Sequence, residues 1–207
     1  SGSNQEIKGG AEMQTRIHGV DLDELAANHP GEDFIDDLGE LFSRVQKIVD
    51  SDIVCKDLLS EAKKYLDSWS GFRKVPEKTI IHADYHPWNL SFIDGQVCRV
   101  FDFDFVQPGR QVYDLGISLT YFHRTPDNRF DPQQAREKTK LYLDSYSKRI
   151  SLSDEEHAQV STMMVIRLVD NLTRDLKSKD NSHVLNKSNI RNVDALRWAL
   201  ELDMSKL

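Results

Sequence analysis

The spacing of apolar residues changes twice along this chain, and this change limits the possible folds more than any other sequence feature. Two early segments, residues 33–50 and 58–69, repeat apolar side chains at helical spacing. Three short β-rich runs follow, at residues 79–82, 90–93 and 97–101. Asp94-Gly95 separates the last two runs and is a hairpin turn signal. The pattern predicts a small antiparallel hairpin inside a mostly helical α+β chain.

Helical spacing returns after Pro108-Gly109, where we expect the chain to break. The predicted later helices span residues 113–123, residues 131–149 starting at Asp131-Pro132, residues 153 to about 176, and a last segment from Val193 to Leu202. Ser153 followed by Glu156 is a capping box for the third of these. Residues 177–187 are polar and predict a loop.

The chain start is expected to be flexible over residues 1–10, with residues 11–207 forming one domain. Ser1-Gly2-Ser3 resembles a cloning remnant, and residues 11–18 predict the end of a helix that stops at Gly19. The segment from Asp21 to Glu40 holds eight acidic residues and no lysine or arginine. Such a run predicts a solvated surface, and alternatively one that attracts cationic ligands.

Composition narrows the class of protein. The chain has 207 residues, of which 39% are hydrophobic and 29% charged, as in globular domains. No run of 18 apolar residues predicts a membrane span, and a net charge of −7 disfavours a nucleic-acid partner. Cys55 and Cys98 are too few for a disulfide framework or a four-thiolate zinc site, so we expect a cytoplasmic protein.

The segment from Ile80 to Gly116 carries the residues suited to catalysis. A β-run ends at His82, Asp84 follows in a loop, Asn89 comes five residues later, and the hairpin then leads to Asp102. This spacing suits phosphoryl transfer. A loop carboxylate can accept a hydroxyl proton, while an amide oxygen and a second carboxylate can hold Mg²⁺, which prefers oxygen ligands.

Three elements of this segment resemble the aminoglycoside phosphotransferase and choline kinase-like family, whose members have a protein-kinase-like fold. They are His82-Ala83-Asp84 with Asn89, Phe101-Asp102-Phe103, and Asp114-Leu115-Gly116. Their order and spacing match that family's pattern over about 35 residues. The resemblance implies a phosphotransferase that uses ATP (or GTP) and Mg²⁺, and it implies that this chain is the kinase-like C-terminal lobe.

By resemblance, Asp84 is the catalytic base, Asn89 and Asp102 bind Mg²⁺ and the nucleotide, and His82 and Asp114 support the catalytic loop. Asp114 is expected to be buried and to accept hydrogen bonds from backbone N–H groups. Ala83 replaces the family's usual glycine, which matters only if the backbone there needs a positive φ. Trp88 also stands where glycine is common, and we expect it to pack over the loop.

Neighbouring residues have plainer interpretations. His86, before Pro87, predicts a turn residue, and Asp104 is interpreted equally well as solvated or as a support for the site. Three phenylalanines, Phe101, Phe103 and Phe105, alternate with acids and predict core packing in a strand-like segment. Tyr121 and Phe122 likewise predict core positions.

The β-rich N-terminal lobe of this family has no counterpart in the sequence. Lys8 is the only lysine before Lys47, and residues 1–70 predict helix and loop. We therefore expect these 207 residues alone to bind ATP–Mg²⁺ poorly, to transfer phosphate negligibly, and to self-associate through apolar surface that the absent lobe would cover.

Three functions are compatible with these observations. The first is phosphoryl transfer to a hydroxyl of a small, aminoglycoside-like or amino-alcohol-like molecule, and the acidic run would suit a cationic one. The second is a non-catalytic kinase-like lobe that binds metal, ligand or partner. The third, least supported, is a metal-dependent hydrolase with His82, Asp84 and His86 as ligands.

Overall fold

The computed structural model describes residues 3–21, 38–49, 55–69, 79–123, 129–177 and 187–207. These residues form a mostly helical fold with two small two-stranded antiparallel sheets, which confirms the α+β prediction. The helices are α1 (Asn4–His18), α3 (Gly39–Val49), α4 (Lys56–Asp67), α5 (Gln111–Phe122), α6 (Pro132–Tyr146), α7 (Asp154–Lys177) and α8 (Lys187–Glu201), with 3₁₀ turns η1 (Pro87–Asn89) and η2 (Met204–Lys206). The strands are β1 (Thr79–Ile81), β2 (Leu90–Ile93), β3 (Gln96–Val100) and β4 (Gln107–Gly109).

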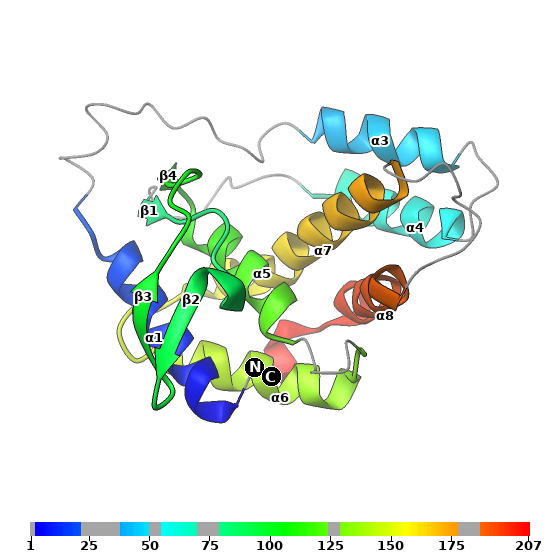
Figure 1. The fold of residues 1–207 in the computed structure, drawn as a ribbon. Coiled ribbons are helices and arrows are strands. Elements are labelled where there is room, and N and C mark those ends of the chain that lie inside the picture. The colour runs from blue at the N-terminus through cyan, green and yellow to red at the C-terminus, as the bar shows by residue number, and fades with distance from the viewer. Residues whose placement is uncertain (1–2, 22–37, 50–54, 70–78, 124–128, 178–186) are drawn as a thin grey trace.

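Helix α5 runs through the centre of the molecule, between α7 above it and α6 below it (Figure 1). Its residues from Asp114 to Phe122 are all buried. Gly116 allows α5 to approach α7 closely, because a Cβ at this position would stand 2.4 Å from the Cβ of Met163. This close packing fixes α7 beside the segment that leads into α5.

The hairpin is formed as predicted. Strand β2 pairs with β3, Leu90 opposite Val100, and Gly95 takes a φ of 76° in the turn, a conformation that favours glycine. Pro108-Gly109 does not simply break the chain, because both residues belong to β4, which pairs with β1. This second sheet clamps the two ends of the segment that carries the catalytic-loop residues.

The first helix begins earlier than expected. Residues 1–10 were predicted to be flexible, but α1 starts at Asn4 and Ser3 is its N-cap. Ser3 Oγ accepts from the Glu6 backbone N–H, and Glu6 Oε2 accepts from the Ser3 N–H at 2.9 Å. Such a capping box satisfies N–H groups that a helix start leaves without partners. Ser3 therefore belongs to the fold, whatever its origin.

The remaining helix predictions are confirmed where the structure describes the chain. Asp131 caps α6, and the Ser153–Glu156 capping box opens α7. Residues 33–37 of the first predicted helix, most of the acidic run and most of the loop at 177–187 lie outside the described residues. None of the described helices combines the length and apolar character that a membrane span requires.

Candidate active site

The predicted catalytic loop starts where β1 ends. Ala83 follows with a φ of 61°, a left-handed conformation that costs an alanine about 1 kcal/mol or more. The positive φ explains why glycine is common at this position in the resembling family. Asp114 compensates, since its Oδ1 accepts a hydrogen bond from the Ala83 N–H at 2.8 Å. The bond from Asp114 on α5 thus holds the loop in its strained conformation.

Asp114 is fully buried on α5, with no exposed surface. Its Oδ2 accepts from the His82 backbone N–H at 3.1 Å and lies 3.1 Å from His18 Nε2. Burial alone would raise the pKa of this carboxyl. The bond to His18, the charge of His18 and the His82 N–H outweigh burial, so the pKa of Asp114 is lowered. Burial and both backbone bonds match what the sequence predicts.

Asp84 points from this loop toward α7, and both of its carboxylate oxygens have partners. Oδ1 accepts from Arg167 Nη2 at 2.8 Å. Oδ2 lies 3.2 Å from His86 Nε2 and 3.4 Å from Asn89 Nδ2. Burial acts to raise the pKa of Asp84, but the His86 bond and the charges of His86 and Arg167 lower it on balance. The carboxylate is therefore ionised and oriented.

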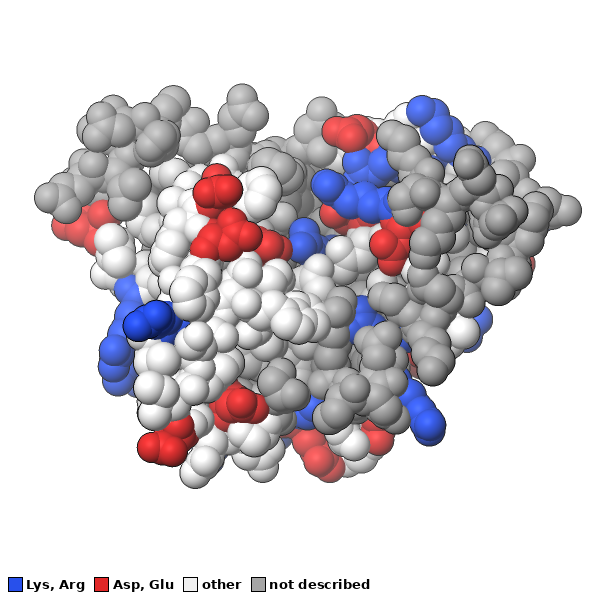
Figure 2. Space-filling model, in the orientation of Figure 1, with Lys and Arg blue, Asp and Glu red and all other residues white. Residues whose placement is uncertain are grey.

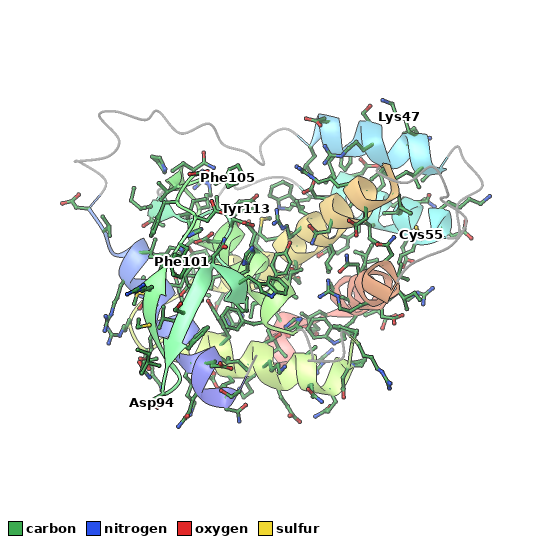
Figure 3. The ribbon with its side chains drawn as sticks, in the orientation of Figure 1. Lys47, Cys55, Asp94, Phe101, Phe105 and Tyr113 are labelled. Atoms are coloured by element: carbon green, nitrogen blue, oxygen red, sulfur yellow. The ribbon has the colours of Figure 1, made fainter. Side chains whose placement is uncertain are left out.

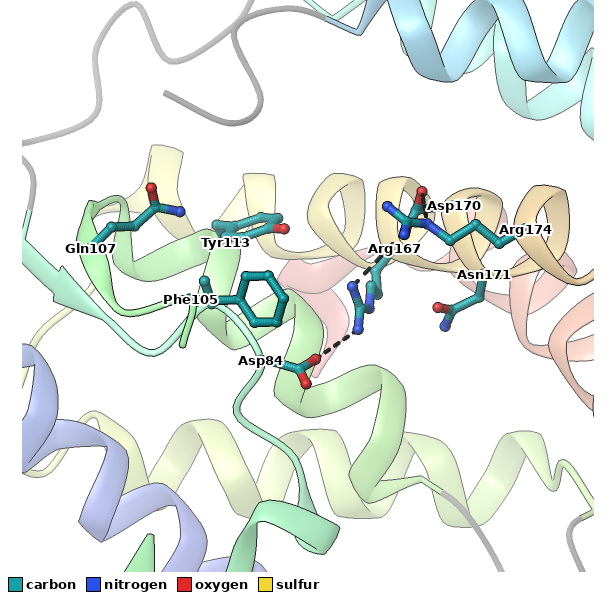
Figure 4. Close-up of a pocket in the computed structure, with 9 residues that line it drawn as sticks. Asp84, Phe105, Gln107, Tyr113, Arg167, Asp170, Asn171 and Arg174 are labelled. Carbon is teal, nitrogen blue, oxygen red and sulfur yellow. Dashed lines mark hydrogen bonds and ion pairs between the residues drawn. The ribbon is translucent and has the colours of Figure 1, made fainter. Parts of the chain in front are cut away.

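A cavity of about 250 Å³ opens beside Asp84. Phe105 and Tyr113 lie on one side of Asp84 in Figure 4, and Arg167, Asp170, Asn171 and Arg174 lie on the other, all four from α7. Ala83 and Gln107 complete the lining. Burial raises the pKa of Tyr113 to about 12, so its phenol is neutral and can donate a hydrogen bond. A polar small molecule placed here would contact the Asp84 carboxylate.

Asn89 and Asp102 are brought together by the hairpin. The Phe101 N–H donates to the Asn89 carbonyl at 2.9 Å, directly beyond the Leu90–Val100 pair. Asn89 Nδ2 donates to the Asp84 carbonyl at 3.0 Å, which leaves its amide oxygen as the group that could ligate a cation. Asp102 is exposed and has a φ of 60°.

The donor set of this pair fits Mg²⁺ bound together with phosphates. Within the described ranges, no three His, Cys, Asp or Glu side chains gather as a metal cluster. Mg²⁺ in kinase sites needs no such cluster, since one or two protein oxygens suffice when phosphate and water fill the other positions. Asn89 and Asp102, whose backbones the hairpin pairing brings near each other, carry two such oxygens.

The histidines of the motif do not form the alternative hydrolase site. His82 is fully buried, and its Nε2 donates to the Phe101 carbonyl at 2.9 Å, a structural role. His86, predicted to be a turn residue, directly precedes the 3₁₀ turn η1, and its ring also contacts the Asp84 carboxylate. The His86 ring also packs edge-on against Trp88 and Tyr121. Trp88 is 58% exposed at the mouth of this aromatic group.

The phenylalanines after the hairpin were predicted to lie in the core, and this is wrong. Phe101, Phe103 and Phe105 are 43%, 49% and 55% exposed. The chain does not continue as a strand here, so strand alternation cannot bury one side of it. Figure 3 shows Phe101 and Phe105 at the same end of the hairpin as the site, opposite to the Asp94 turn. Asp104 is also exposed, whereas Tyr121 and Phe122 are buried as predicted.

Sequence reasoning missed the contribution of α7. Arg167 reaches Asp84, and Asp170 lies 2.5 Å from Arg44 Nη2 and 2.9 Å from Arg174 Nε. Basic and acidic side chains stand together where α3 and α7 meet on the face shown in Figure 2. One signal was present: Arg167 and Asp170 interrupt the apolar stretch from Met163 to Leu172, and charges in a buried helix face need partners.

Comparison with known proteins agrees with the motif. Residues 10–148 match the model of the phosphotransferase enzyme family, 139 of the 207 residues. The chain belongs to this family.

Among curated proteins, the chain is 28% identical over 123 residues to a homoserine kinase of Rhodopseudomonas palustris, covering 56% of this chain and 36% of the relative. It is 31% identical over 110 residues to the homoserine kinase of Gluconobacter oxydans, covering 51% and 33%. The matched part of the chain thus spans about a third of these curated relatives.

Solved structures show the same fold. An amicoumacin kinase in complex with AMP-PNP, Ca²⁺ and Ami superposes with a TM-score of 0.62 at 14% identity, covering 98% of this chain and 61% of the other. A putative aminoglycoside phosphotransferase of Ralstonia eutropha gives 0.61 at 16% identity, covering 96% and 64%. The choline kinase of Cryptosporidium parvum gives 0.60 at 15% identity, covering 97% and 66%. These likenesses confirm the kinase-like fold predicted from the motif.

Proposed function

We propose that this protein transfers the γ-phosphate of ATP (or GTP) to a hydroxyl of a small molecule, with Asp84 as the base. The observation that carries the proposal is the position of the Asp84 carboxylate. It is ionised, faces a cavity large enough for a small substrate, and is fixed by Asn89, His86 and Arg167. A carboxylate so placed can orient a hydroxyl and accept its proton as phosphate transfer proceeds.

Asn89 and Asp102 would hold Mg²⁺ with the phosphates of the nucleotide. When bound, the ion neutralises negative charge on the phosphoryl group. Asp114 and His82 keep the loop in register with the hairpin. The buried Asp114 carboxylate is bonded to the loop backbone, and the buried His82 ring is bonded to the Phe101 carbonyl at the end of the hairpin. The chain's own residues therefore supply a base, two cation ligands and a rigid support.

The size of the cavity favours a small substrate. Its volume of about 250 Å³ lies below the range of roughly 300–1,000 Å³ that is usual for drug-sized ligands. A hydroxy amino acid or amino alcohol suits it better than an aminoglycoside. The names of the curated relatives point to homoserine as the first compound to test.

The test measures ADP formation by the intact protein with ATP–Mg²⁺ and a panel of homoserine, choline, ethanolamine and an aminoglycoside. Asp84→Asn should lower kcat by about 10²–10⁴-fold with the best substrate, because the amide cannot accept the proton. Asp94→Asn is the matched control. Asp94 lies at the far tip of the hairpin in Figure 3 and has a φ of 49°, which asparagine tolerates.

Near-normal turnover in a folded Asp84→Asn variant would refute the base role. Full activity of the Asp94→Asn control is expected, and a matching loss there would show that removal of any carboxylate disturbs the protein. Absence of ADP formation with every hydroxyl compound, while ATP still binds, would favour the non-catalytic binding module instead.

A further inference from the structure

Both oxygens of the Asp84 carboxylate already have basic or amide partners in the structure. Oδ1 is bonded to Arg167, and Oδ2 is shared by His86 and Asn89. A base must come within hydrogen-bond reach of the proton that it accepts. A carboxylate paired with a cation is a weaker base, so the release of one partner on substrate binding would make Asp84 better able to accept that proton.

Arg167 is the partner placed to leave. His86 and Asn89 belong to the same short loop as Asp84, and the Asn89 amide also bonds the Asp84 carbonyl at 3.0 Å, so they remain beside it. Arg167 comes from α7, across the cavity, as Figure 4 shows. Its guanidinium rests on the ring of Tyr121, 5.4 Å from the ring centre, and a side chain of this length can swing along that ring.

The acceptors that α7 brings to the cavity wall beside Arg167 are already engaged, since the Asn171 amide oxygen accepts from the Tyr121 hydroxyl at 3.3 Å. Asp170 is already matched by Arg44 and Arg174, and its Oδ2 lies 4.0 Å from Arg167 Nη1. The buried Arg167 Nε and Asn171 Nδ2 find no acceptor among the residues that the structure describes. Unsatisfied buried donors are costly, and a guanidinium with a free Nε beside a free amide nitrogen favours an anionic ligand group.

We propose that Arg167 exchanges partners during binding, leaving Asp84 for a carboxylate of the substrate. The proposal rests on the function proposed above and narrows the substrate to a hydroxy acid, with a hydroxy amino acid as the zwitterionic case. Arg167 and Asn171 bind the substrate carboxylate, and Asp84 Oδ1 becomes free for the hydroxyl. A substrate without a carboxylate leaves the base engaged, so Arg167 both positions the base and selects the substrate.

The chemical step balances with the groups named. The substrate hydroxyl gives its proton to Asp84 Oδ1 while its oxygen forms a bond to the γ-phosphorus of ATP. The bond from that phosphorus to the β,γ-bridging oxygen breaks, and ADP leaves with the electron pair. Arg167 takes no proton, because a guanidinium stays charged throughout.

The experiment compares homoserine with 3-aminopropan-1-ol, which has the same chain and amine but no carboxylate. In the intact wild-type protein, homoserine should be the better substrate in kcat/KM. Arg167→Gln should lower kcat/KM for homoserine by about 10- to 100-fold, since a charge-assisted bond is lost. The same variant should raise kcat/KM for 3-aminopropan-1-ol, because Asp84 is released without a carboxylate.

Arg197→Gln is the matched control, because Arg197 is 64% exposed on α8 and pairs with Asp194 at 3.7 Å. This control should leave kcat/KM unchanged for both substrates. Arg167→Lys, which keeps the charge and most of the stem, covers the case in which the glutamine variant does not fold. It should shift the preference in the same direction by a smaller factor.

Parallel losses for both substrates in folded Arg167 variants would overturn the exchange while leaving the phosphotransferase proposal intact. If kcat/KM falls equally for both substrates and the KM for ATP also rises, Arg167 would be assigned to the nucleotide phosphate. That result would also overturn the exchange. If the wild-type protein phosphorylates neither compound nor any other hydroxyl compound, the proposed function fails and the exchange fails with it.

Discussion

Replacement of Asp114 by asparagine should destabilise the fold more than any surface change of the same kind. The Asp114 carboxylate accepts three bonds, from the backbone N–H groups of His82 and Ala83 and from His18 Nε2. Asparagine has the same shape but only one side-chain oxygen. If that oxygen keeps the Ala83 bond, the amide nitrogen faces the His82 N–H, and two donors oppose each other in a buried site.

The magnitude follows from these contacts. An unsatisfied buried donor costs about 1–3 kcal/mol, and a bond that loses its charge loses about 1 kcal/mol more. We expect Asp114→Asn to lower the free energy of unfolding by about 2–4 kcal/mol at neutral pH. Asp144→Asn on α6 is the control, because Asp144 is 60% exposed and pairs with Lys140 at 3.8 Å. Exposed pairs of this kind contribute about 0–1 kcal/mol.

The pH dependence provides a second readout. The pKa of Asp114 is lower in the folded protein than the ordinary value of 3.8, so its ionisation stabilises the fold above that value. That contribution is lost as the pH falls through the lower folded pKa. Urea unfolding at a series of pH values should therefore show the wild-type and Asp114→Asn curves converging in acid. Equal stability of the two proteins at neutral pH would refute this account of the loop support.

Other substitutions and titrations test the remaining geometry. Gly116→Ala should lower the free energy of unfolding by about 1–3 kcal/mol or more, because the new Cβ would meet both the side chain and the backbone of Met163. An unchanged urea midpoint would contradict the close packing of α5 on α7. The Tyr113 phenol should ionise only near pH 12, which near-ultraviolet absorbance can follow against a Tyr113→Phe control. Ionisation near pH 10, the ordinary pKa of tyrosine, would show that its burial is misassigned. His123 is fully buried and its pKa is lowered by burial to about 3, so its ring signals in proton NMR should stay constant at neutral pH; titration near pH 6.5 would contradict its buried position.

The site's central segment was predictable because its geometry is local. Asn89 follows Asp84 by five positions, and a two-residue turn at Asp94-Gly95 fixes the hairpin that leads to Asp102. Turn chemistry and spacing act over short distances, so they are visible in the sequence. The position of Asp114 was predictable only through resemblance, since Asp114 lies 30 positions after Asp84.

Long-range contacts account for most of what the sequence did not predict. The pairing of β4 with β1 joins Gly109 to Thr79, and nothing in a three-residue strand that contains Pro108 signals it. The prediction that the three phenylalanines after the hairpin lie in the core failed for a related reason. Alternation predicts one buried face only if the segment is a strand, and residues 101–106 turn instead.

Arg167 shows why a family motif locates a reaction more readily than a substrate. The motif residues lie on one loop and one hairpin, whereas Arg167, Asp170 and Asn171 come from a helix that begins 40 residues after Asp114. Gly116 allows α5 to pack closely against α7, the helix from which Arg167 reaches Asp84. Sequence changes along α7 can therefore alter what binds in the cavity without touching the motif. In the proposed exchange, substrate choice would depend on helix packing, which apolar spacing alone does not reveal.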